Sequence, residues 1–138
     1  MNEAIRKTLV VLPIIVIAGC GGRGARELVS VNVTPNAADA QSFPNDQVQF
    51  MASGTFSQPP SPVQLTSQDV MWCIGDPNGH CAGFINSGAT VSPSGLAQCN
   101  SGFNGIVTVL AGQPQGPAPM PDVGTQLRIF GTAQLTCP

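Results

Sequence analysis

The sequence predicts an all-β fold, an antiparallel sandwich of about seven short strands. Hydrophobic and polar residues alternate in several short segments, which is the period of a strand with one buried face. Turn-forming Gly and Pro, of which the chain has 16 and 13, separate these segments. No segment has the 3.6-residue hydrophobic period of an amphipathic helix. Because 42% of its 138 residues are hydrophobic, the chain can form one domain with a core.

The first two predicted strands alternate from residue to residue. In "LVSVNVTP", Val29, Val31 and Val33 are expected to share the buried face, and Pro35 ends the strand. The segment "QVQFMASGTF" has the same alternation. Its expected buried face is formed by Val48, Phe50, Ala52, Gly54 and Phe56.

The third predicted strand, "DVMWCIGD", carries the single tryptophan of the chain. We expect Val70, Trp72 and Ile74 to point into the core, because alternate residues of a strand share a face. Met71 and Cys73 are then expected to point outward. Trp72 is predicted to pack between the two sheets, and an exposed role in stacking against a sugar is the less favoured alternative.

The remaining strands follow at short spacing. The segment "GATVSPSGLAQC" predicts two strands around a Pro-Ser-Gly turn, and "GIVTVLAG" predicts a short apolar strand. The last strand is "TQLRIFGTAQLTC", in which Gly131 is the expected position of a bend or bulge.

The N-terminal segment has the parts of an export signal. Arg6 and Lys7 form a positive head, and the apolar run from Thr8 to Gly19 follows. This run is shorter than the roughly 20 residues that a membrane-spanning helix needs, and Pro13 interrupts it. We therefore predict a signal peptide over residues 1–19.

The run closes as Ile17-Ala18-Gly19-Cys20, which resembles the lipobox of bacterial lipoproteins. The resemblance implies cleavage before Cys20, a lipid on its thiol, and attachment to a membrane. Residues 20–27 are then the lipidated cysteine and a flexible tether, and residues 28–138 are the domain. Gly21 stands where inner-membrane lipoproteins often have Asp, which implies the outer membrane. The alternative is an uncleaved N-terminal anchor in which Cys20 has no role.

Five segments together resemble the bacterial immunoglobulin-like domain, group 2, of invasins and intimins. They are "VSVNVTPNAADA", "QVQFMASGTFS", "LTSQDVMW", "ATVSPSGLAQC" and "GIVTVLAG", within Leu28 to Cys137. The resemblance implies an immunoglobulin-like (Ig-like) sandwich that acts in adhesion, in spacing or in contact with glycans at the cell surface. It brings no catalytic residues to this chain.

Four cysteines follow the lipobox: Cys73, Cys81, Cys99 and Cys137. An even number in an exported chain predicts two disulfides, and three pairings are open. A zinc site is the less favoured alternative, because the spacing lacks the short cysteine pairs of zinc motifs. In an Ig-like topology all four sulfurs are expected to gather at one pole of the sandwich.

Charge and composition limit the function. Charged residues are 9% of the chain and the formal net charge is −2, so no basic surface for nucleic acid is predicted. Asp76 and His80 lie in "DPNGHC", which predicts a β-turn; a catalytic group or a calcium site there is much less favoured. We predict no catalytic residue, metal site or cofactor.

Two functional classes remain open. The first is a non-enzymatic, lipid-anchored envelope domain that binds a surface protein or glycan, or acts as a spacer. The second is an accessory lipoprotein subunit of an envelope or secretion assembly. The Pro-rich segment "GQPQGPAPMPDVG", residues 112–124, is either a contact surface or a solvated loop.

Overall fold

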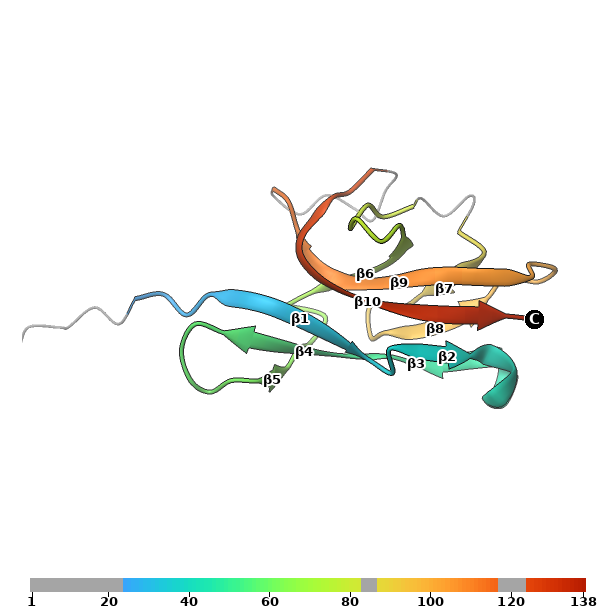
Figure 1. Ribbon diagram of the computed structural model, residues 1–138, viewed down its shortest axis with the longest axis horizontal. Coiled ribbons are helices and arrows are strands. Elements are labelled where there is room, and N and C mark those ends of the chain that lie inside the picture. Colours follow the sequence, from blue (N-terminus) through green and yellow to red (C-terminus); the bar gives the residue numbers. More distant parts are fainter. Residues whose placement is uncertain (1–23, 83–86, 117–123) are drawn as a thin grey trace, which may run out of the picture.

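The computed structural model describes residues 24–82, 87–116 and 124–138, which form an all-β, sandwich-like fold, as the sequence predicts (Figure 1). Ten strands and two short 3₁₀ helices lie in these residues, against about seven strands expected. Their bounds are β1 Leu28–Thr34, β2 Ala37–Asp39, η1 Ala40–Ser42, η2 Pro44–Asp46, β3 Gln47–Gln49, β4 Met51–Phe56, β5 Val63–Gln64, β6 Met71–Gly75, β7 Ala89–Val91, β8 Leu96–Cys99, β9 Gly105–Pro114 and β10 Leu127–Cys137.

The strands form three hydrogen-bonded sheets. One has four strands in the order β2-β10-β9-β6, and two have three strands in the orders β1-β4-β5 and β3-β8-β7. The segment expected as one strand is divided at Phe50 into β3 and β4. There the Phe50 amide donates to the Gly95 carbonyl oxygen at 2.9 Å. The single predicted strand therefore supplies both three-stranded sheets.

Side chains from all three sheets meet in one main core. The five residues expected at its centre, Val48, Phe50, Val70, Trp72 and Ile74, are all buried. The Trp72 ring lies against Gly95 in the turn between β7 and β8. Gly95 has a φ of +84°, and a Cβ atom there would lie 2.4 Å from the Phe50 carbonyl oxygen and 2.9 Å from the Trp72 ring. Glycine is therefore required at this contact.

The expected buried face of the first strand is wrong at Val29. The pairing of β1 with β4 shifts register between Leu28 and Ser30. Because such an irregularity reverses the side-chain alternation, Leu28 is buried and Val29 is 60% exposed. Val31 and Val33 lie in the core as expected.

Of the bend or bulge expected at Gly131, a bulge is not found at that position. The pairing of β10 with β9 is continuous through Gly131, and its register shift falls between Leu127 and Ile129. Gly131 instead permits a close approach of β1, because a Cβ atom there would lie 2.6 Å from the Val31 carbonyl oxygen.

Strand β2 was not expected from the sequence. Its three residues pair in parallel with Gln134–Thr136 of β10, whereas the other strand pairs are antiparallel in the residues described. After β2, the short helices η1 and η2 lead into β3. Figure 1 shows β1 and β2 in succession along the long axis, with η1 and η2 at the end opposite the start of β1.

Candidate functional site

The turn after β6 contains the single histidine of the chain. Asp76 Oδ1 accepts hydrogen bonds from the backbone N–H groups of Asn78 at 2.8 Å and His80 at 3.2 Å. Its Oδ2 lies 3.2 Å from His80 Nδ1, and both side chains are about half exposed. This network closes a β-turn, as the sequence "DPNGHC" predicts.

The charge of Asp76 is stabilised by the same network. Desolvation raises the pKa of Asp76, but the backbone N–H groups of His80 and Asn78 and the His80 side chain together lower it below its ordinary value. The carboxylate therefore stays ionised and holds the turn. Within the described residues, the hydrogen bonds of His80 go to Asp76 and to backbone groups of the turn, and no serine hydroxyl joins them.

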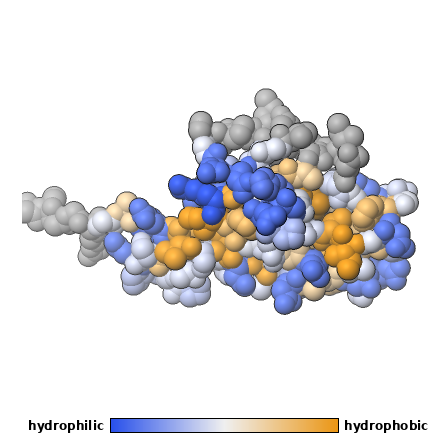
Figure 2. Space-filling view, turned by 45° about the horizontal axis from the view of Figure 1, so that its top comes forward, coloured by the Kyte–Doolittle hydropathy of each residue, from blue (hydrophilic) through white to orange (hydrophobic). Residues whose placement is uncertain are grey.

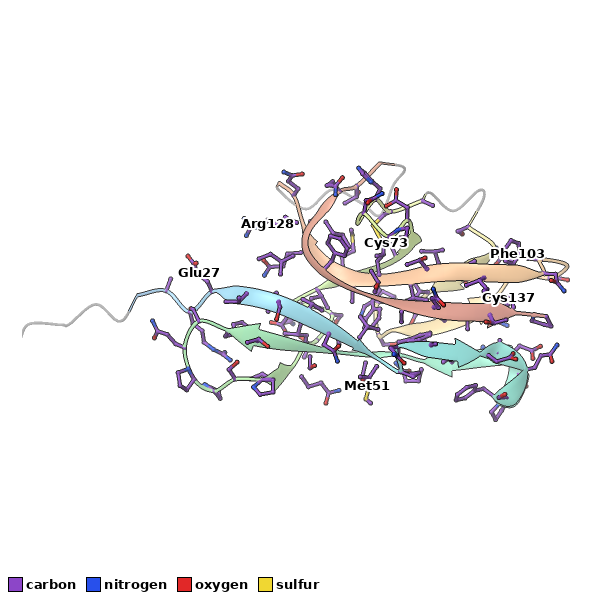
Figure 3. All side chains as sticks on the ribbon, in the orientation of Figure 1. Glu27, Met51, Cys73, Phe103, Arg128 and Cys137 are labelled. Atoms are coloured by element: carbon purple, nitrogen blue, oxygen red, sulfur yellow. A yellow bond between two sulfur atoms is a disulfide. The ribbon has the colours of Figure 1, made fainter. Side chains whose placement is uncertain are left out.

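The four cysteines form two disulfides, Cys73–Cys81 and Cys99–Cys137. This is one of the three pairings left open by the sequence. The expectation that all four sulfurs gather at one pole is wrong. Cys73 pairs in register with Leu110 of β9, whereas Cys137 pairs with Gly105, five residues along the same strand. Five residues of strand span about 17 Å, and Figure 3 shows Cys73 and Cys137 well apart.

The two bridges also lie on opposite faces of the four-stranded sheet. Cys137 belongs to the main core, because alternate residues of β10 face the other sheets. Cys73 and Cys81 belong to a second hydrophobic cluster with Leu110 and Leu127, against which Met71 and Phe130 pack. Met71 and Cys73 thus point away from the main core as expected, but the face to which they point is covered rather than exposed.

An apolar pocket of about 470 Å³ lies between β6 and β7, which are edge strands of their sheets. Its described lining includes Val70, Trp72, Ile74, Ala89 and Val91. Trp72 is 7% exposed, so the pocket meets only a small part of its side chain. Trp72 is therefore a core residue and presents no free ring face to a sugar.

Hydrophobic residues also reach the surface away from this pocket. Figure 2 shows several such areas on one face, separated by hydrophilic ones. The most exposed large hydrophobic side chains of the described residues are Val29, Phe43, Met51 and Ile106. Val29, Met51 and Ile106 lie in β1, β4 and β9, and Phe43 lies between η1 and η2, so these side chains do not share one element.

Residues 24–27, expected as part of the tether, are attached to the turn after β4. Gln58 Nε2 donates to the Gly24 carbonyl oxygen at 2.8 Å. Glu27 and Ser57 exchange two hydrogen bonds: the Glu27 amide donates to Ser57 Oγ at 3.0 Å, and the Ser57 amide donates to the Glu27 carbonyl oxygen at 2.9 Å. Figure 3 shows Glu27 near this end of the molecule.

Arg26 makes the remaining contacts of this attachment. Its Nε donates to the Gln58 carbonyl oxygen at 3.3 Å, and its Nη2 donates to the Pro60 carbonyl oxygen. Its guanidinium carbon lies 3.7 Å from the centre of the Phe56 ring, a cation–π contact. We call the contacts of residues 24–27 with residues 56–60 the N-terminal clamp. This attachment could not be predicted from the sequence, because the two segments are about 30 residues apart.

Several predicted features lie outside the described residues. They are the signal peptide, Cys20, the tether up to residue 23, and residues 117–123 of the Pro-rich segment. In the part of the chain that the structure describes, no helix is long and apolar enough to cross a membrane. Among the same residues, no three His, Cys, Asp or Glu side chains are grouped so that they could hold a metal ion.

The sequence was compared with protein-family models and with curated proteins, and nothing matches in either comparison. The resemblances to the lipobox and to the group 2 Ig-like domain therefore remain hypotheses that rest on the residues quoted for them.

Proposed function

We propose that the protein is a lipid-anchored, non-enzymatic domain of a bacterial cell envelope, which binds a surface protein or glycan or acts as a spacer. The observation that carries the proposal is the apolar run that ends in Ile17-Ala18-Gly19-Cys20. A cysteine behind two small residues, at the end of a signal-length run, has the residue types that thioether lipidation and cleavage require. Gly21 in the next position supports attachment to the outer membrane, because inner-membrane lipoproteins often have Asp there.

The two disulfides support export. Disulfides persist in oxidising compartments such as the periplasm and the cell surface. Cys99–Cys137 joins strands that are 38 residues apart, and Cys73–Cys81 closes a loop of 8 residues. Two disulfides are therefore consistent with a domain outside the cytoplasm, and a lipobox signal would direct export to that location.

The pocket between β6 and β7 supports a binding role over a purely structural one. Its apolar lining fits an apolar group, such as a hydrophobic side chain of a protein partner. The turn at Asp76 and His80 supports no reaction, because its polar groups are used in holding the turn. An accessory subunit of an envelope assembly is the second candidate function, and a gene neighbourhood of export or assembly components would favour it.

The anchor is tested by metabolic labelling of cells with radioactive palmitate. The wild-type protein should be labelled and should partition into detergent, and Cys20→Ala should lose both properties. The other four cysteines are bonded in pairs and cannot replace Cys20. Gly22→Ala, two residues further on, is the matched control and should keep the label. Label on the Cys20→Ala protein would refute the lipid anchor.

A further inference from the structure

The N-terminal clamp leaves very little chain between the proposed lipid and the sandwich. Three residues, 21–23, separate Cys20 from Gly24. An extended chain spans at most about 3.6 Å per residue, so the Cα atoms of Cys20 and Gly24 are at most about 14 Å apart in any conformation. If the chain were free up to Leu28, the same limit would be about 29 Å. The clamp therefore halves the reach of the tether.

This limit is close to the thickness of the membrane surface. The polar headgroup layer on each side of a bilayer is about 5–8 Å thick. Acyl chains on Cys20 would hold that residue at the inner boundary of this layer. Gly24, and the turn that is hydrogen-bonded to it, would then lie within the headgroups or within about 10 Å of them.

We infer that the end of the sandwich formed by residues 24–27 and the turn 57–62 is a lipid-facing surface, which the clamp holds against phospholipid headgroups. The inference rests on the proposed lipid anchor and adds the orientation of the domain on the membrane. The surface that faces away from the bilayer is then the end that contains η1 and η2 (Figure 1).

The chemistry of the two ends agrees with this orientation. The turn "SQPPSP", residues 57–62, has no charged side chain, and the Arg26 guanidinium lies over it. The exposed Glu27 balances the charge of Arg26, so residues 24–27 and 57–62 together have no net charge. Asp39 and Asp46 are at the opposite end, in β2 and η2. Strand β1 alone, with 7 residues, separates the ends by about 24 Å. This exceeds the Debye length of about 8 Å at physiological salt, so these carboxylates are screened from anionic lipid.

The test uses the full lipidated protein in vesicles of phosphatidylethanolamine and phosphatidylglycerol that carry a nickel-chelating lipid. A nitroxide is attached at position 59 through Pro59→Cys, or at position 41 through Gln41→Cys as the matched control. Pro59 lies in the turn, and the exposed Gln41 lies in η1 at the opposite end. Relaxation of the nitroxide by the headgroup nickel is expected to be several-fold stronger at position 59.

The contacts of Gly24 and Arg26 are then removed by the double variant Arg26→Ala and Gln58→Ala. This variant keeps the Glu27–Ser57 hydrogen bonds, but it raises the limit between Cys20 and the first attached residue to about 25 Å. Arg128→Ala is a control that also loses one positive charge. The difference in nitroxide relaxation between positions 59 and 41 should become smaller in the double variant and should remain in Arg128→Ala. Equal relaxation at the two positions, or a contrast that survives in the double variant, would overturn the inference. Flotation with the vesicles is measured first. A protein that does not float would refute the lipid anchor itself, which separates the two failures.

Discussion

Removal of each disulfide should destabilise the domain by a different amount. Loop closure in the unfolded chain costs entropy that grows with the logarithm of loop length, and a disulfide removes this cost from folding. With the separation of 38 residues for Cys99–Cys137, the relation gives about 3.9 kcal/mol at 25 °C. With the separation of 8 for Cys73–Cys81, it gives about 2.5 kcal/mol.

The assay compares the variants Cys99→Ala/Cys137→Ala and Cys73→Ala/Cys81→Ala by urea unfolding, both in the Cys20→Ala background. Cys73, Cys81 and Cys137 are buried and Cys99 is partly buried, so the packing loss should be no larger in the Cys99/Cys137 variant. A larger total cost in that variant therefore reports on loop length. We expect the free energy of unfolding of the Cys99/Cys137 variant to be about 1.4 kcal/mol below that of the Cys73/Cys81 variant. This difference is about a tenfold effect on the folding equilibrium. An equal or larger loss of unfolding free energy in the Cys73/Cys81 variant would refute this reasoning. It would mean that the second cluster contributes more to stability than the length of the closed loop does.

Four further substitutions test the core and the charges. Trp72→Ala should lower the free energy of unfolding by about 3–5 kcal/mol, because the side chain is buried in the main core. The half-buried Met71→Ala should cost less than half of that, and a larger cost at Met71 in urea unfolding would contradict the register of β6. Gly95→Ala should cost about 1–3 kcal/mol, because its φ is +84° and a Cβ atom would contact the Phe50 carbonyl oxygen; unchanged stability would contradict that contact. The backbone and side chain of Thr66 hold the pKa of Asp69 below its ordinary value of 3.8, so the stability it contributes is present above about pH 4 and is lost as the pH falls through the folded-state pKa. Asp69→Asn should therefore weaken the fall in the urea midpoint below pH 4, and an unchanged fall would exclude this role for Asp69.

The alternation of side chains was sufficient to predict the fold class and the main core. It is a local pattern, and in β4 the local pattern and the tertiary packing agree. In β6 they agree for Trp72 and Ile74, but Cys73 between them is also buried, on the other face of the sheet. At β1 they disagree, because the register shift beside Val29 depends on the partner strand β4. No property of the segment "LVSV" alone indicates that Leu28 rather than Val29 is buried.

The features that the sequence did not predict depend on contacts between distant segments. Strand β2 has three residues and no alternation that marks it, and it is a strand because β10 offers a free edge beside it. The second cluster was missed for the same reason. Its covering residues, Leu127 and Phe130, come from a strand more than 50 residues after Cys73. The N-terminal clamp likewise joins residues 24–27 to a turn that composition marks only as Pro-rich.

The identity of the N-terminal residue tests the central claim most directly. Protein extracted from the membrane fraction is digested, and the mass of its N-terminal peptide is measured. A lipid-anchored envelope protein should begin at Cys20, with the mass of that peptide raised by a diacylglyceryl group and its acyl chains. A peptide that begins at Met1, or one that contains unmodified Cys20, would contradict the account.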